Sequence, residues 1–184
     1  ISFLSGVSST DWSWAPLFAD YDNDGDKDLM VTNGFYRDLG DLDYIHYQTK
    51  LNSPMGSQAA KRKEKLKAVK ELATIPLNDY FFENNNDLTF TKRSDDWGFT
   101  EPGFSNGACY ADLDNDGDLD LVVNNISKEA FIFINNTREK DKPSNTHFLS
   151  IQLKGDSLNT HGFGSKIFVY NNGSTQLQEQ NPVR

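Results

Sequence analysis

Residues 112–120 read Asp112-Leu113-Asp114-Asn115-Asp116-Gly117-Asp118-Leu119-Asp120 and run directly into the apolar triplet Leu121-Val122-Val123. A second copy, Asp20-Tyr21-Asp22-Asn23-Asp24-Gly25-Asp26-Lys27-Asp28, precedes Leu29-Met30-Val31. Five like charges within nine residues repel one another, and a divalent cation removes that repulsion while taking oxygen ligands. We therefore predict a cation site in each of the two loops.

The donor set of these loops favours Ca²⁺. Mg²⁺ prefers a smaller octahedral shell, and the loops offer neither the nitrogen nor the sulfur ligands that zinc favours. An EF-hand loop would need a glutamate at position 12 and a helix on each side, but position 12 is Val31 or Val123, in an apolar run typical of a strand. We therefore expect two Ca²⁺ loops that each join two strands.

Each position of the loop has an expected role, by analogy with the half that it shares with an EF-hand. The side chains at positions 1, 3 and 5 should each give an oxygen ligand, position 7 should bind through its backbone carbonyl with a free side chain, and position 9 should complete the shell. In order, the positions are Asp20, Asp22, Asp24, Asp26 and Asp28 in the first copy, and Asp112, Asp114, Asp116, Asp118 and Asp120 in the second. The alternative is a solvated acidic turn, which identical spacing in two copies disfavours.

The loops and the residues before them carry a family resemblance. Trp14–Ala19 and Phe104–Ala111 look like strands that lead into the loops, although the first copy has Ala15-Pro16 in place of Gly-Ala. The whole pattern resembles the FG-GAP repeat, also called the VCBS-type repeat, which forms blades of integrin-like β-propellers. The resemblance implies structural Ca²⁺ in each blade and a location outside the cell or in the cell envelope.

The spacing of the repeats predicts a helical insertion in the first blade. The two loops are 92 residues apart (112 − 20), whereas the motifs at Phe82 and Phe133 are 51 apart (133 − 82). The difference of 41 residues matches a segment at about 35–76 with helical periodicity and helix-forming composition, broken near 52–56. We predict a mainly β fold with two blades over residues 1–136 and exposed edges, because two blades cannot close a ring.

The second expected helix carries a basic run, Lys61-Arg62-Lys63, followed by further lysines. Such a run could bind a phosphate group. Because glutamates at 64 and 71 interrupt it, a solvated face is the favoured interpretation.

The polar stretch 137–146 is expected to be a linker, after which residues 147–153 alternate as in a strand. Residues 147–184 resemble the start of an ASPIC/UnbV domain through Leu153, Gly155, Asn159, Gly162 and Gly164, with Ser165 where alanine is usual. FG-GAP repeats followed by this module are the arrangement of the cartilage-acidic-protein-like family. The resemblance implies a partial β module at the C-terminal end.

Composition narrows the classes of partner. The net charge of −9 and the pI of about 4.7 disfavour nucleic acid, and no apolar stretch is long enough for a transmembrane helix. The single cysteine, Cys109, is expected to be buried in a strand. The chain has no initiator methionine and no signal peptide, and we interpret it as a fragment of a longer protein.

No catalytic constellation is visible in the sequence. The acidic residues converge on two loops instead of forming an acid–base pair across a cleft, and His46, His147 and His161 are widely separated. We expect a non-catalytic, calcium-stabilised segment that binds a protein or a glycan, for example in adhesion. The alternatives are a part of a polysaccharide-processing enzyme with its catalytic residues elsewhere, and a purely architectural surface repeat.

Overall fold

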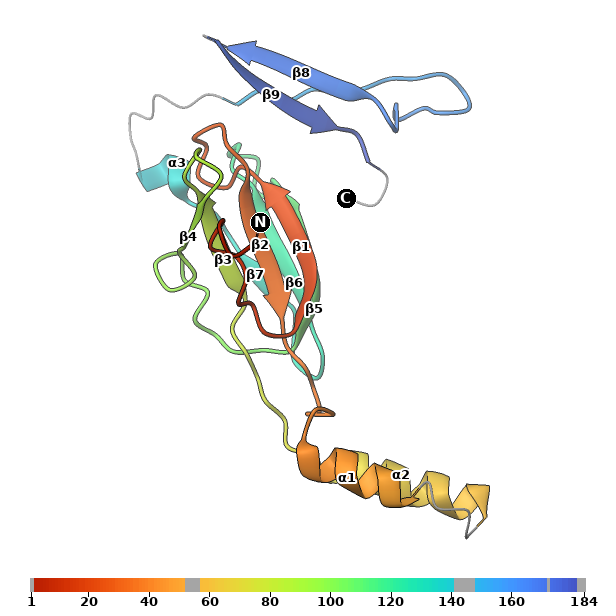
Figure 1. Cartoon of the computed structure of the whole chain (residues 1–184). Coiled ribbons are helices and arrows are strands. Elements are labelled where there is room, and N and C mark those ends of the chain that lie inside the picture. The colour runs from red at the N-terminus through yellow and green to blue at the C-terminus, as the bar shows by residue number, and fades with distance from the viewer. Residues whose placement is uncertain (1, 52–56, 141–147, 172, 182–184) are drawn as a thin grey trace.

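Two antiparallel sheets packed face to face form the body of the chain, and a separate hairpin follows them (Figure 1). The computed structural model describes residues 2–51, 57–140, 148–171 and 173–181. The predicted break at 52–56, most of the linker, His147 and Asn172 lie outside the described residues. The mainly β fold with a helical insertion is confirmed.

The first sheet is a meander of four strands in the order β1-β2-β3-β4. Its strands are β1 (Ser13–Ala19), β2 (Asp28–Asn33), β3 (Tyr80–Asn84) and β4 (Phe90–Lys92). Every residue of β2 is buried, since both faces of this strand are covered. Pro16 lies in β1 at the edge of the sheet, where the lack of an N–H is tolerated.

The second sheet repeats the first three strands of this pattern. It contains β5 (Ser105–Ala111), β6 (Asp120–Asn125) and β7 (Phe131–Phe133), in that order. Ala19 pairs with Asp28 at the end of the first hairpin, as Ala111 pairs with Asp120 in the second. Leu29 pairs with Phe82, as Leu121 pairs with Phe133. The offsets of 92 and 51 residues therefore hold in the strand register as they do in the sequence.

The helical insertion leaves the first sheet after β2 and returns before β3. It comprises α1 (Leu42–Leu51) and α2 (Gln58–Glu71), which project from the end of the sheet opposite the acidic loops (Figure 1). Its two ends are held together by a bridge between Phe35 and Ile75 and by a hydrogen bond from Arg37 Nη1 to the Leu72 carbonyl. Since the chain leaves and re-enters at one place, the insertion does not disturb the pairing of β2 with β3.

The core between the two sheets is built from the faces that they turn toward each other. Met30 and Val123 are fully buried, one from each sheet, and Phe81 is 2% exposed. Phe81 packs on Tyr21, Trp97 and Phe99, with ring centroids 4.6 to 4.9 Å apart. Phe99 in turn packs on Phe133 of the second sheet at 4.4 Å, so this aromatic cluster joins the two sheets.

The opposite face of the first sheet is covered by the N-terminal segment, which sequence analysis left without a role. Leu29, Val31 and Phe82 form a small second core, to which Val7 adds its side chain. The Phe90 amide donates to the Ser5 carbonyl at 2.9 Å, so the segment also lies beside β4.

Two predictions about particular segments differ from the structure. Residues 148–153 contain no strand, so the strand predicted at 147–153 is wrong for the described part. A hairpin follows, formed by β8 (Lys166–Asn171) and β9 (Ser174–Glu179), and a four-residue helix α3 (Thr137–Lys140) begins the expected linker. Cys109 lies in β5 as predicted, but it is exposed. It belongs to the face of the second sheet that points away from the first, which periodicity alone could not reveal.

Substitution Phe81→Ala is expected to lower the free energy of unfolding by about 3–5 kcal/mol, since it empties the centre of the aromatic cluster. Denaturant titration would measure this loss. The control Phe3→Ala removes a ring that is 85% exposed and should change stability by less than about 0.5 kcal/mol. Equal effects of the two substitutions would contradict the packing described here.

Candidate metal centre

The two acidic loops join the first two strands of each sheet and lie at the same end of the body (Figure 1). They have the same backbone shape. Asn23 and Asn115, at position 4, both have φ +63°, while Gly25 and Gly117, at position 6, have φ +99° and +94°. Glycine is required at position 6 because a side chain there would be strained. The sequence copies are thus also structural copies.

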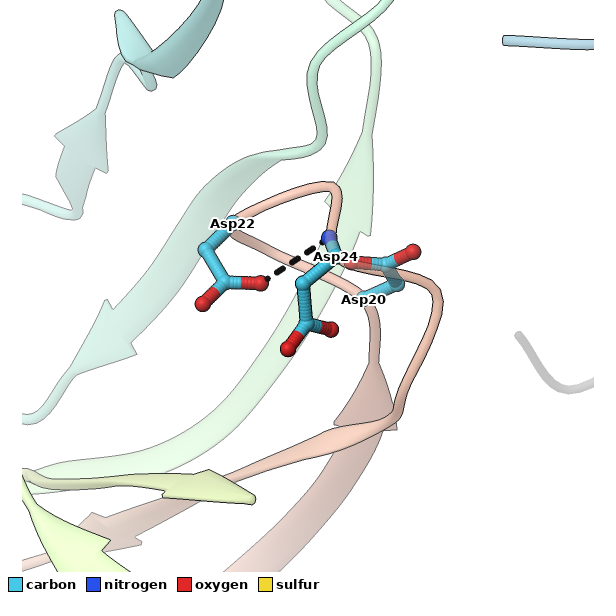
Figure 2. A group of neighbouring side chains, drawn as sticks. All are labelled: Asp20, Asp22 and Asp24. Carbon is cyan, nitrogen blue, oxygen red and sulfur yellow. Dashed lines mark hydrogen bonds between the residues drawn. The ribbon is translucent and has the colours of Figure 1, made fainter. Parts of the chain in front are cut away.

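Each loop brings three carboxylates to one point. Asp20, Asp22 and Asp24 offer oxygen atoms that all lie within 4.8 Å of one another, and Asp112, Asp114 and Asp116 do the same. Figure 2 draws the three side chains of the first loop. These six residues are the predicted ligands at positions 1, 3 and 5. The structure therefore brings the expected side chains together in both copies.

The hydrogen bonds inside each loop use one oxygen of each carboxylate of the triad. Asp20 Oδ2 accepts from the Gly25 amide, Asp22 Oδ1 from the Asp24 amide and Asp24 Oδ1 from the Asp26 amide, at 2.8–3.2 Å. The second loop has the same three bonds, to Asp112 Oδ2, Asp114 Oδ1 and Asp116 Oδ1. One oxygen of each group fixes the backbone and the other remains for a cation.

One atom gives an independent test of the fit to a cation. Asp20 Oδ1 is buried, and within the described part of the chain it accepts no hydrogen bond. A buried carboxylate oxygen without a partner is costly, and a divalent cation bound among the three carboxylates would satisfy it. The first loop therefore fits a hard cation.

The carboxylates at position 9 are not members of these triads, and their hydrogen bonds attach the loop to the sheet. Asp28 Oδ2 accepts from the Tyr21 amide and Asp28 Oδ1 from the Asn84 amide, at 3.2 and 2.9 Å. Asp120 makes the equivalent bonds to the amides of Leu113 and Asn135, at 2.7 and 2.8 Å. Any bond from Asp28 or Asp120 to a cation would be additional to these hydrogen bonds, so the part of both residues in the metal shell stays a prediction.

The side chain at position 7 differs between the copies. The Asp118 carboxylate is fully buried and accepts from Asn23 Nδ2 of the other loop at 2.7 Å and from the Arg138 amide at 2.8 Å. The expectation of a free side chain is therefore wrong for Asp118. Because Asn23 and Asp118 meet only when the sheets pack, no local sequence signal could have indicated the bond.

Burial and mutual repulsion raise several carboxylate pKa values in the first loop. Desolvation, followed by the charge of Asp24, raises the pKa of Asp22 from 3.8 to about 6. Desolvation and then the charge of Asp22 raise the pKa of Asp28 to about 7, against the lowering effect of the Asn84 amide. The loop therefore holds its negative charge at an energetic cost unless a cation is bound.

A hollow of about 560 Å³ opens between the two sheets, beside β3 and β7. Phe81, Trp97 and Phe133 line it, and Asp22 of the first loop reaches its edge. Arg93 on its rim pairs with Glu83 at 2.6 Å and with Asp96 at 3.3 Å. Sequence analysis missed this feature because its walls come from three separate segments.

Comparison with known proteins agrees with the geometry of the loops. Residues 72–123 match the family model of the FG-GAP-like repeat. The chain contains an FG-GAP-like repeat. The matched stretch runs from the end of α2 through β3, β4, β5 and the second acidic loop into β6. The matched stretch thus contains β3 and β4 of the first sheet and β5 and the start of β6 of the second sheet.

No curated protein and no solved structure matches the chain significantly. The first acidic loop lies outside the matched stretch, but its shape and hydrogen bonds copy those of the loop inside it. Among the described residues, no helix is long and apolar enough to cross a membrane. The FG-GAP-like repeat and the paired antiparallel sheets are consistent with a β-propeller-like fold.

Substitution Asp22→Asn should have opposite effects with and without metal. In EDTA at pH 7.5 it removes a desolvated charge and keeps the carbonyl that accepts from the Asp24 amide. After solvent screening, the free energy of unfolding should rise by about 1 kcal/mol, which corresponds to a rise of about 2–4 °C in the melting temperature. In excess Ca²⁺ it removes a ligand charge, so the melting temperature should fall below that of the unsubstituted chain. Asp95→Asn, at an exposed aspartate outside the loops, is the control.

The pH dependence of the metal-free chain has a definite sign. The folded chain keeps protons on Asp22 and Asp28 that the unfolded chain releases near pH 4, so stability should fall as pH rises from about 4 to about 7. Thermal melting in EDTA at several pH values would measure this slope. A melting temperature that rises through this range would contradict the assignment, and Asp22→Asn should flatten the part below pH 6.

Proposed function

We propose that this chain is a calcium-binding segment of a β-propeller, with one Ca²⁺ in each acidic loop. The supporting observation is the duplicated triad, in which each carboxylate uses one oxygen to hold the loop and leaves the other for a cation. Three carboxylates match the hard oxygen donors that Ca²⁺ takes, with backbone carbonyls and water completing its larger shell.

The proposed role of the ion is structural. It binds the folded loop and not the unfolded chain, so it stabilises the fold by mass action. FG-GAP repeats are typical of extracellular and cell-envelope proteins, and weak sites in such modules are filled at the millimolar calcium concentration outside cells. We place the protein there.

Addition of Ca²⁺ to the chain in EDTA-treated buffer should raise the melting temperature by about 5 °C or more. Saturation at 100 times the dissociation constant stabilises one site by about 2.7 kcal/mol, and about 1 kcal/mol corresponds to about 2–4 °C in a chain of this length. Asp20→Asn and Asp112→Asn should each remove one bound ion, counted by calorimetric titration. The calcium site is refuted if the melting temperature and the heat of titration are the same with and without the ion.

We further propose that the segment binds a protein or a glycan and has no catalytic role of its own. The hollow between the sheets has a volume typical of ligand sites, with aromatic walls and a charged rim. Its carboxylates Glu83 and Asp96 are both paired with Arg93, which disfavours an acid–base pair. The hollow with its aromatic walls favours a glycan ligand over a purely architectural repeat. An ASPIC/UnbV-like module at 147–184 remains part of the proposal.

Screening of the chain against a glycan array, in Ca²⁺, tests the binding role. Trp97→Ala should weaken any glycan that is bound in the hollow by about tenfold or more, since it removes an aromatic wall. Trp12→Ala, at a partly exposed ring that stacks on Phe35 away from the hollow, is the matched control. A ligand that loses equal affinity in both variants does not occupy the hollow, and release of sugar products would favour the enzymatic alternative.

A further inference from the structure

The two acidic loops are in direct contact, although their contacting residues are 95 positions apart in the sequence. Asn23 of the first loop donates from Nδ2 to Oδ1 of Asp118 in the second loop, at 2.7 Å. Asp118 is fully buried, and its second oxygen accepts from the Arg138 amide. A hydrogen bond to a buried, charged acceptor is among the stronger ones in proteins.

Both ends of this bond are joined to metal ligands. Asn23 lies between Asp22 and Asp24, which are two of the three carboxylates of the first triad. The Asp118 amide donates to Asp116 Oδ1 at 2.8 Å, so Asp118 holds a carboxylate of the second triad in place. A shift of either loop is therefore transmitted to the ligands of the other.

A second bridge runs beside the first. Asn135, which follows β7, donates from Nδ2 to the Tyr21 carbonyl of the first loop at 2.6 Å and to the Leu119 carbonyl of the second at 3.4 Å. The backbone amide of Asn135 donates to Asp120 Oδ1. The first loop therefore has two polar attachments to the second sheet.

We propose that the two metal sites are coupled, so that an ion in either loop raises the affinity of the other through the Asn23–Asp118 hydrogen bond. The proposal rests on the proposed function as a calcium-binding segment. An ion orders the loop that holds it, and an ordered loop presents Asn23 or Asp118 in the position that the other loop requires. The second ion then loses less conformational entropy on binding than the first. The coupling is reciprocal by thermodynamic necessity.

The chain contains its own control for this contact. Asn115 occupies the same loop position as Asn23 with the same φ of +63°, but it is exposed, and its side chain has no hydrogen bond to any described residue. Glycine adopts this conformation without strain. Asn23→Gly and Asn115→Gly therefore perturb the two loops equally in the backbone, and only the first removes a contact between loops.

Calorimetric titration of the whole chain with Ca²⁺ tests the coupling. The double variant Asp20→Asn/Asp24→Asn disables the first loop but keeps the carbonyl oxygens that hold its backbone, so it reports the affinity of the second loop alone. The second loop should bind about fivefold or more weakly in this variant than in the chain whose first loop is loaded, within the usual range of coupling between sites. Asn23→Gly should reduce that ratio to less than twofold, and Asn115→Gly should preserve it.

A second variant protects the test from a trivial loss of structure. Asn23→Asp keeps the size and the tolerance of positive φ but replaces the donor by an acceptor that repels Asp118. It should abolish the coupling as Asn23→Gly does, with the melting temperature in EDTA confirming that the chain is folded.

Two ions that bind independently in the unsubstituted chain would overturn the coupling and leave the calcium site intact. Equal loss of coupling in Asn23→Gly and Asn115→Gly would also overturn it, because the effect would then come from the loop and not from the bond. The absence of any calcium-dependent heat or melting shift would overturn the coupling together with the proposed function.

Discussion

The buried carboxylate at the end of each acidic loop is the constraint on which the rest depends. Asp28 and Asp120 each accept one amide from their own loop and one from the chain at the third strand. A carboxylate removed from water is stable only when such donors surround it. Since the donors come from the loop and from the end of the third strand, and the acceptor begins the second strand, these three segments take up one arrangement together. This arrangement then positions the three carboxylates of each triad and the residues of the interface between the sheets.

Much of the fold follows from short-range patterns in the sequence. The strands around the loops were predictable because apolar residues alternate with acidic turns there, and the helical insertion because two offsets, 92 and 51, disagree by its length. The convergence of the carboxylates at positions 1, 3 and 5 was predictable because one short loop supplies all three side chains. In these cases local chemistry is sufficient.

Features that depend on contacts between distant segments could not be predicted in this way. The packing of Val7 against Leu29 and Val31, the exposure of Cys109 and the bond from Asn23 to Asp118 all depend on which faces lie against each other. Alternation marks two faces of a strand but does not say which partner covers each face. The segment before the C-terminal hairpin shows the same limit, because residues 148–153 alternate in sequence but form no strand.

The difference between the two loops follows from their places in the stack of sheets. Asn23 and Asp118 meet because the first sheet packs on the second, while Asn115, at the same loop position as Asn23, is exposed. A further sheet on either side, packed with the same offset, would bring Asn115 to a position-7 aspartate and Asp26 to a position-4 asparagine. Asp118, at position 7, has a role that no single loop explains, since its side chain is the acceptor for Asn23 of the other sheet. Repeats that are alike in sequence would in this way be joined by the residues that are not needed as ligands.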